Sequence, residues 1–323
     1  MRLHFFTVLL TAFLFAAPVN AADSSEPEAM TISNSSPGSV YYPYGHGLAI
    51  LLTKYVGVTF TDEPSQASAQ NVILVEQRKA TLGFATMGVA LQAWNGTGWA
   101  KGTRYRSIRA LFPMYDTPFQ FAAPQRLHLA SLGGFAGKRI GAGPKASTAG
   151  TYFPELFKVL EIPTVLRNGA WDGLFGQVAS GELDGIAIAL GSFVPDLAAL
   201  DAKEPLDFIQ PSPDQIVLLR TRFPELTPSL IPSGTYPSQH EDYRTVGLYN
   251  FAIIRQDVPE DLVYRIVKAV FEHPQEMVSI HPLPKETVPS NLDRDTFLPF
   301  HPGAARYYRE IGVAIPPAIE PVS

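Results

Sequence analysis

The sequence predicts an α/β fold, because short strand-like segments alternate with amphipathic helical segments along most of the chain. Three loops rich in small residues, at 35–39, 64–68 and 143–150, each follow a predicted strand and precede a predicted helix. The chain has 323 residues, of which 46% are hydrophobic and 17% charged. That length allows two domains with a sizeable core. We therefore expect an α/β architecture with largely parallel sheets.

The periodicity of apolar residues assigns the elements in chain order. The first helix begins at about Gly45 and ends at Gly57, and its apolar positions form one face. Further helices are expected around 72–75, 89–94, 152–160 and 171–179. The predicted strands are 30–33, 58–61, 82–85, 108–114, 119–123, 138–142 and 184–189. We expect the Pro-rich tail after Ile315 to be frayed.

Residues 1–21 have the layout of a secretory signal peptide. A lone Arg2 precedes an uncharged run at 5–17, and Val19-Asn20-Ala21 offers a cleavage site near Ala21. The alternative, an uncleaved anchor, needs a longer apolar run. An exported chain without cysteine indicates the bacterial periplasm as its location.

Composition and motifs argue against several function classes. A net charge of −5 without a basic run disfavours nucleic-acid binding. The absence of cysteine excludes disulfides, thiol catalysis and iron–sulfur clusters. The sequence has no GxSxG, HExxH or P-loop motif, and its seven histidines show no i, i+4 metal spacing. We expect no catalytic residues, no metal and no cofactor.

The three small-residue loops are the candidate ligand site. In open α/β sheets, ligands bind beyond the carboxyl ends of the strands, and a helix N-terminus accepts an anion without a lysine or arginine. Any single loop is more simply explained as a plain helix cap, and it is the presence of three such loops in one chain that favours shared ligand binding. Tyr41 and Tyr42 follow the first loop and either contact ligand or pack in the core. The other candidate ligand-binding side chains in and beside the loops are Ser36, Ser39, Ser65, Ser68, Asn71, Ser147 and Thr148.

Several motifs carry a resemblance to a known family. Residues 38–45 (GSVYYPYG) resemble the GG-x-YYP-x-G segment of the TAXI-type solute receptors of TRAP transporters, and residues 301–313 (HPGAARYYREIGV) are similar to that family's terminal HPGAxRYYxExG. Further similar segments lie at 65–71, 137–150, 181–185 and 259–272. Together they span nearly all of the chain after the signal segment.

The resemblance implies a type II periplasmic-binding-protein fold with a ligand cleft between two α/β lobes. Lobe 1 would comprise 22–120 and 250–323, lobe 2 would comprise 121–249, and the crossing strands would lie near 119–123 and 245–254. It also implies a monomeric receptor that binds a small carboxylate, either a dicarboxylate or a glutamate-like solute. The receptor would deliver this solute to TRAP membrane subunits, which import it with an ion gradient. A sensor-kinase partner and a periplasmic hydrolase are the alternatives.

One departure from the family pattern bears on the solute. Where family members often carry Gln-Ser-Asp, this chain has Thr86-Met87-Gly88, and we include Thr86 among the ligand-binding candidates. The missing acid favours a dicarboxylate over an amino acid, because an ammonium group needs a carboxylate partner. Lys145, in the third loop, either pairs with a solute carboxylate or is a solvated charge. Trp171-Asp172-Gly173 is compatible with a wall of the second lobe, or more simply with Asp172 as a helix N-cap.

Overall fold

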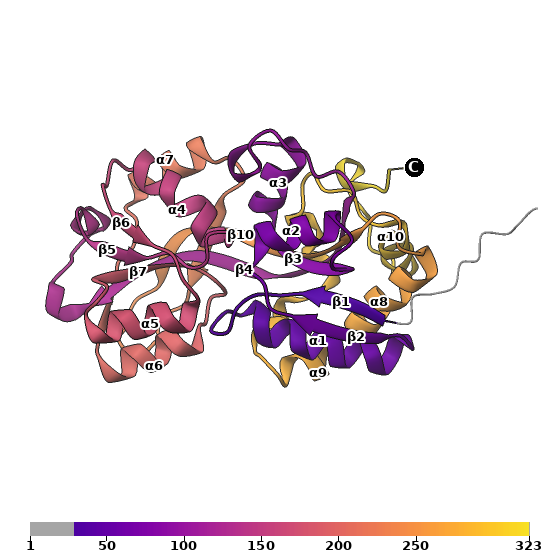
Figure 1. Cartoon of the computed structure of the whole chain (residues 1–323), viewed down its shortest axis with the longest axis horizontal. Helices are drawn as coiled ribbons and strands as arrows, with labels where there is room; N and C mark the ends of the chain where they lie inside the picture. Colours follow the sequence, from indigo (N-terminus) through magenta and orange to yellow (C-terminus); the bar gives the residue numbers. More distant parts are fainter. Residues whose placement is uncertain (1–28, 323) are drawn as a thin grey trace, which may run out of the picture.

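The strands form one curled, hydrogen-bonded sheet in the computed structural model, which describes residues 29–322 (Figure 1). The predicted signal segment 1–21 lies outside the described residues. β8 (Leu206–Phe208) pairs with β4, and β9 (Thr227–Ile231) pairs with β10. The remaining strands follow the spatial order β2 (Thr59–Glu63), β1 (Ala29–Ser33), β3 (Leu82–Thr86), β10 (Tyr243–Arg255), β4 (Ile108–Pro124), β7 (Gly185–Ala189), β5 (Arg139–Gly141), β6 (Val165–Arg167).

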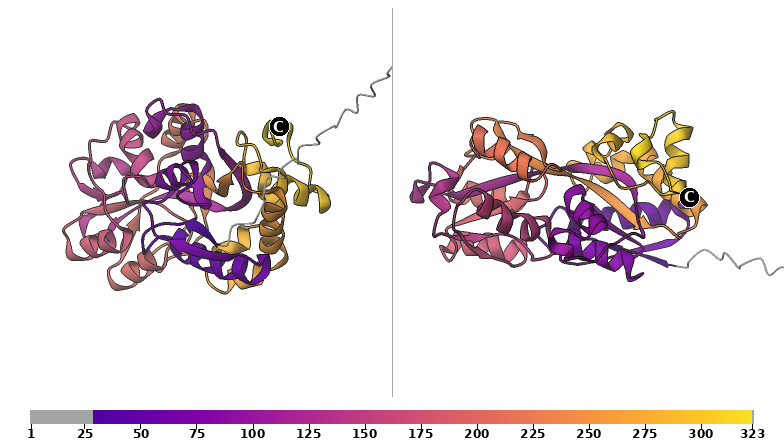
Figure 2. Two further views of the ribbon diagram at one scale, coloured as in Figure 1. Left: turned by 45° about the vertical axis from the view of Figure 1, so that its right-hand side comes forward. Right: turned by 90° about the horizontal axis from the view of Figure 1, so that it is seen from above.

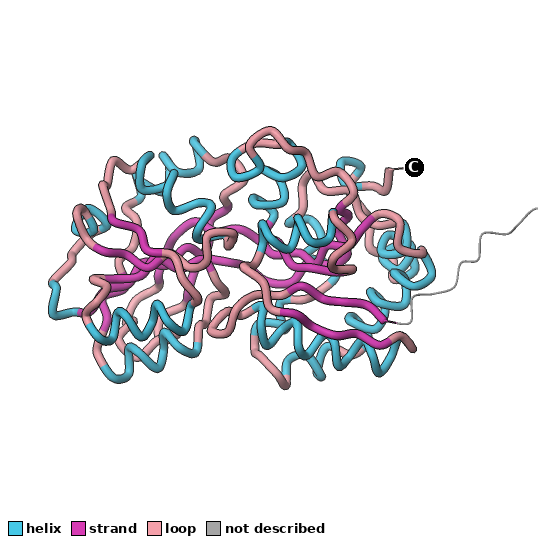
Figure 3. The backbone as a smooth tube through the Cα atoms, in the orientation of Figure 1, coloured by secondary structure: helices cyan, strands magenta, loops and turns pink. Residues whose placement is uncertain are grey.

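Helices cover this sheet in two groups, which define two lobes (Figures 1 and 3). Lobe 1 surrounds β1–β3 and carries α1 (Tyr41–Val56), α2 (Ser68–Glu76), α3 (Met87–Asn95), α8 (Glu260–Glu272), α9 (Pro274–Val278) and α10 (Pro302–Glu310). Lobe 2 surrounds β5–β7 and carries α4 (Thr148–Val159), α5 (Trp171–Ser180), α6 (Pro195–Lys203) and α7 (Pro213–Arg222). The C-terminal segment returns to lobe 1, where α8 packs on α1 and α10. Figure 2 shows the two lobes side by side from further directions.

Two long antiparallel strands connect the lobes. β4 pairs with β10 in lobe 1 and with β7 in lobe 2. The α/β prediction is confirmed, but the sheet is mixed rather than largely parallel. Pairs within each lobe, such as β1 with β2 and β5 with β6, are parallel. β10 runs antiparallel to β3, β4 and β9 because it returns the chain from lobe 2 to lobe 1.

β4 is a single strand of 17 residues, whereas the sequence predicted two strands. The two predicted strands were separated by 115–118, which contains Asp116 and Pro118. In the structure Asp116 and Thr117 still pair with residues of β10. The lobe boundaries expected at 120/121 and 249/250 fall within β4 and β10, and they stay a prediction.

Two further details of the prediction were wrong. α1 begins at Tyr41 rather than Gly45. The helix includes Pro43, because a helix tolerates proline in its first turn, where the N–H groups have no intrahelical partner. The tail is ordered against the protein, because Ile319 is fully buried and accepts a hydrogen bond from the backbone of Phe300.

Candidate functional site

A small closed cavity lies between the two lobes, where the N-termini of α1, α2, α4 and α5 meet. The volume open to the centre of a water molecule is about 20 Å³, enough for about one water. Both lobes and the two connecting strands contribute to this interlobe cavity. Its lining residues are Ser39, Tyr41, Ala67, Ser68, Tyr115, Thr117, Ser147, Thr148, Trp171, Ala189, Leu190 and Asn250.

The helix starts that surround the cavity follow from local sequence. Ser147 caps α4, since its hydroxyl accepts a hydrogen bond from the backbone N–H of Gly150. Ala67 precedes α2 with φ +69° and ψ −148°, a conformation that favours glycine. Asp172 lies in the first turn of α5 and is not its cap, contrary to one reading of the sequence; Ala170 holds that position.

A chain of hydroxyl groups connects the lobes across the cavity. Thr148 of lobe 2 lies 3.1 Å from the hydroxyl of Ser68 and 3.0 Å from that of Thr86, both in lobe 1. The backbone N–H of Ala69 also donates to the carbonyl of Ala146, at 2.8 Å. We call these three contacts the interlobe latch. They can form only when the lobes are closed.

Asn250 fixes the direction of the hydrogen bonds at the base of the cavity. Its Nδ2 donates to the carbonyl of Tyr115 at 2.7 Å, which orients the amide because a carbonyl only accepts. Its Oδ1 therefore faces the hydroxyl of Tyr41, which must donate to it. The pairing of β10 with β4 shifts register at this position, and such irregularities redirect side chains.

The electrostatic character of the cavity comes from dipoles alone. None of the described residues that line it carries a charged side chain. Burial raises the pKa of Tyr41 and Tyr115 above their usual range, so both phenols stay neutral. Helix N-termini present N–H donors and partial positive charge. The arrangement suits an anion or another group rich in hydrogen-bond acceptors.

Comparison with known proteins identifies the family. Residues 32–312 match the model of the NMT1-like family. The chain belongs to the NMT1-like family. The match identifies this family as a whole, and the narrower TAXI assignment stays a prediction.

Solved structures with the same architecture include MatC from Rhodopseudomonas palustris with bound malate, at a TM-score of 0.55 and 12% identity over 88% of this chain and 97% of that one. An ancestral arginine-binding protein bound to arginine has a TM-score of 0.50 and 12% identity, over 81% and 96% of the two chains. A structure described as a periplasmic transporter has a TM-score of 0.51 and 15% identity, over 90% and 94%. At these identities the likeness concerns the fold. The predicted two-lobed periplasmic-binding-protein fold is thereby confirmed.

The structure of this NMT1-like chain brings together six of the ten predicted site residues. Five of them line the cavity, and the sixth, Thr86, bonds directly to Thr148. The five are Ser39, Tyr41, Ser68, Ser147 and Thr148.

The other four predicted residues lie outside the cavity lining. Asn71 is fully buried and makes hydrogen bonds to Ser65, Ser33 and two backbone carbonyls, so Asn71 and Ser65 hold the second loop in place. Ser36 does not reach the cavity, and its buried hydroxyl has no partner among the described residues. Tyr42 points outward, with 38% of its surface exposed.

Sequence reasoning missed the contribution of the two connecting strands. Thr117, Tyr115 and Asn250 line the cavity from β4 and β10. Asn250 was detectable as a lone amide within the apolar run of 246–254, since a buried polar side chain needs partners. Its hydrogen bond to Thr117, which lies 133 residues earlier in the chain, depends on the pairing of β10 with β4, which no local pattern shows.

An open groove of about 950 Å³ adjoins the cavity between α2, α3 and α4. We call it the interlobe groove; Ala69, Trp99, Lys101, Lys145 and Tyr152 are among its lining residues. The hydrogen bond from Ala69 to Ala146 stands between the groove and the cavity. Lys145 thus faces the groove rather than the cavity.

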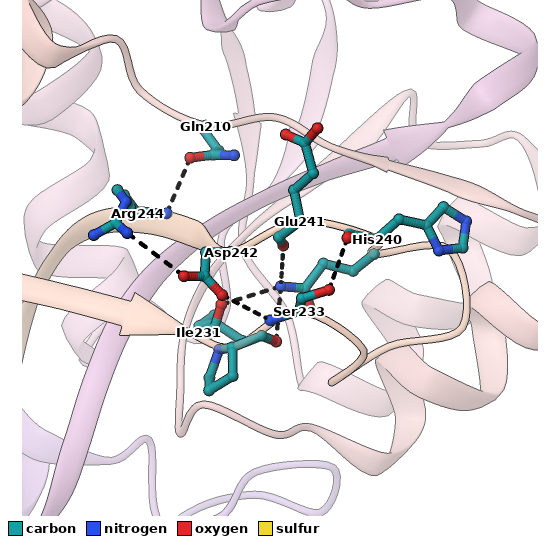
Figure 4. A network of polar contacts seen from close by, with 9 residues as sticks. Gln210, Ile231, Ser233, His240, Glu241, Asp242 and Arg244 are labelled. Carbon is teal, nitrogen blue, oxygen red and sulfur yellow. Dashed lines mark hydrogen bonds and ion pairs between the residues drawn. The ribbon is translucent and has the colours of Figure 1, made fainter.

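A second open hollow, of about 700 Å³, lies on lobe 2 beside β8 and the loop at 232–242. Figure 4 shows the polar contacts that hold this loop. Ser233 bonds to Asp242 at 3.1 Å and to the carbonyl of His240 at 2.7 Å. None of the four helix N-termini lies in its lining, so the interlobe cavity is the better candidate for a binding site.

No helix among the described residues is both long and apolar enough to cross a membrane.

Proposed function

We propose that this NMT1-like protein is a periplasmic solute receptor that encloses a small carboxylate, a dicarboxylate or a glutamate-like compound, between its two lobes. The observation that carries the proposal is the interlobe cavity, in which hydroxyl groups and four helix N-termini face a space without any charged lining residue. Such donors hold a carboxylate through directed hydrogen bonds.

Binding would proceed by opening and closing of the lobes. The cavity is too small for a dicarboxylate in the closed arrangement, so the latch between Thr148, Ser68 and Thr86 must open or widen to admit one. Within the described part of the chain, β4 and β10 alone run between the lobes, and a few residues in such strands can absorb the change in dihedral angles. The solute would enter while these contacts are open, and the latch would form again around the widened, occupied cavity and so join the two lobes.

A receptor role fits better than catalysis. Ser68, Thr148 and Thr117 offer hydroxyl groups, but the described lining residues include no histidine, aspartate or glutamate that could serve as a general base. The names of the similar folds, one with bound malate and one bound to arginine, describe binding of small polar solutes. We therefore propose no enzymatic activity for the cavity.

The partner we propose is the membrane subunits of a TRAP-type importer driven by an ion gradient. This part rests on the motifs at 38–45 and 301–313. We further propose that the chain is exported, cleaved near Ala21, and works in the periplasm as a monomer.

The test has two arms. Isothermal titration of the chain from residue 22 onward with succinate, malate, glutarate and glutamate should show one site with saturable binding and a higher Tm, because a ligand that binds only the folded state stabilises it. Proteoliposomes that contain the membrane subunits should then import the bound solute only with this receptor present and an ion gradient imposed. Binding without uptake would favour the alternative in which the partner is a sensor kinase. Turnover of the solute would contradict the receptor role.

A further inference from the structure

One hydrogen-bond donor of a residue that lines the cavity has no partner among the described residues. The indole Nε1–H of Trp171 is buried without a hydrogen-bond partner among the described residues, and the residue itself has no exposed surface. Buried donors are nearly always paired in proteins. The ring is held in place from two sides, because a methyl group at Gly143 would lie 2.4 Å from its six-membered ring and Phe175 stacks on it.

A second donor follows from the orientation of Asn250. Nδ2 of Asn250 donates to the hydroxyl oxygen of Thr117. The hydroxyl of Thr117 is then an acceptor in that contact, and its own proton is left for a different acceptor. No other hydrogen bond of this hydroxyl is found in the part of the chain that the structure describes.

Several hydroxyl protons at the cavity already have an acceptor within the protein. Tyr41 gives its proton to Asn250, so its oxygen can only accept from Ser68, 3.3 Å away. The hydroxyl oxygen of Ser68 in turn receives the backbone N–H of Thr86. Ser147 both donates to the carbonyl of Pro144 and accepts from Gly150. The protons of Trp171 and Thr117 therefore remain without an acceptor among the described residues, while the hydroxyl oxygens keep lone pairs.

From this balance we infer that the cavity selects an organic anion that has no ammonium group, and that Trp171 and Thr117 donate hydrogen bonds to its oxygens. The inference rests on the proposed receptor function and narrows it to one of the two solute classes proposed there. An ammonium group brings three donors and no acceptor. In this cavity it would meet further donors and four helix N-termini, with no carboxylate to pair with.

The experiment compares matched solutes on the chain from residue 22 onward. Glutarate and glutamate differ only by the ammonium group, as do succinate and aspartate. Calorimetry should show at least tenfold tighter binding of the deaminated member of each pair. Trp171→Phe, which removes the N–H and keeps an aromatic ring, should weaken glutarate binding about tenfold. The control is Trp99→Phe in the interlobe groove, where the indole N–H already donates to the carbonyl of Val89 at 3.0 Å. The affinity of this control variant for glutarate should stay unchanged.

A spectroscopic readout avoids dependence on the folding of a variant. The chain has three tryptophans, so its ¹⁵N–¹H spectrum contains three indole signals, which substitutions of Trp94 and Trp99 assign. Glutarate should move the indole proton of Trp171 downfield and leave that of Trp99 in place. Tighter binding of glutamate than of glutarate, or an unmoved Trp171 signal at saturation, would overturn the inference and leave the receptor function standing. If none of the four probes bound and no solute copurified, both would fail.

Discussion

The interlobe latch gives the sharpest prediction, for the substitution Thr148→Val. The hydroxyl of Thr148 is the lobe 2 atom that meets both Ser68 and Thr86, at 3.1 and 3.0 Å. Valine has nearly the same shape, so the packing stays and both interlobe hydrogen bonds are lost. Ser68 keeps other partners, but the hydroxyl of Thr86 is left unpaired in the closed form and regains water when the lobes open.

The substitution should destabilise the closed arrangement of the lobes and leave the stability of each lobe unchanged. Loss of the two bonds, with one buried hydroxyl left unpaired, should disfavour the closed form by about 1–3 kcal/mol. The dissociation constant for a solute that needs closure should then rise about 5- to 150-fold. The Tm without added solute should change little, because Thr148 makes these bonds to the other lobe and not within its own.

Calorimetry with succinate and glutarate measures the affinity, and small-angle X-ray scattering measures the lobe arrangement. Thr148→Val should bind more weakly and show a larger radius of gyration at subsaturating solute. The matched control is Thr151→Val, one turn further along α4, where the hydroxyl bonds only to the carbonyl of Thr148 in the same helix. Equal losses in both variants, or unchanged affinity and scattering in Thr148→Val, would refute the assignment of the latch.

Three further outcomes follow from the structure. Tyr41→Phe leaves Oδ1 of Asn250 unpaired, so it should lower the free energy of unfolding by about 1–3 kcal/mol and weaken solute binding. Denaturant titrations measure the first effect and calorimetry the second. Tyr42→Phe, at an exposed position, should change neither quantity. Ala67→Gly relieves a backbone conformation with φ +69°, which should raise the free energy of unfolding by about 1–3 kcal/mol. The greater flexibility of glycine in the unfolded chain offsets about 0.5–1 kcal/mol of this gain. Calorimetric scanning should therefore show a higher Tm, and a lower Tm would contradict the strain argument. Burial raises the pKa of Asp295 to about 7; because this lies above the value in the unfolded chain, the folded protein holds the extra proton and the wild type loses stability as pH rises from about 4 to about 7. Asp295→Asn should therefore be more stable than wild type at pH 8, by up to about 4 kcal/mol, and nearly equal to it at pH 4 in urea titrations; a difference that does not vary with pH would contradict the assignment.

Local sequence was enough to locate most of the site. Ser39, Ser68 and Thr148 each lie where a strand ends and a helix begins, and in an α/β fold such points gather at one edge of the sheet. The α/β class followed from the same alternation. Ser65 and Asn71 share the local pattern, but they bond to each other and to the backbone. The sequence pattern alone does not distinguish a loop whose polar groups bind a ligand from a loop whose polar groups bond only within the protein.

The rest depended on contacts between distant segments. Thr117 and Asn250 meet because β4 and β10 pair between the lobes, and a register shift directs the amide of Asn250 toward Tyr115. Asp116 and Thr117 lie within β4 although no local pattern predicts a strand there, because their pairing partners, Tyr249 and Leu248, lie far along the chain. The unpaired N–H of Trp171 is likewise invisible in sequence, since it reflects which neighbours are missing and not which residue is present.

The most direct test of the central claim is native mass spectrometry of the chain purified from the periplasm under gentle conditions. The account predicts one small organic anion per chain, without an amino group, that is lost on unfolding and refolding and restored by adding the same compound. The Thr148→Val variant should carry less of it. A chain that arrives without any solute and binds neither dicarboxylates nor amino acids, or one that carries a cationic solute, would contradict the claim that the interlobe cavity is an anion-binding site.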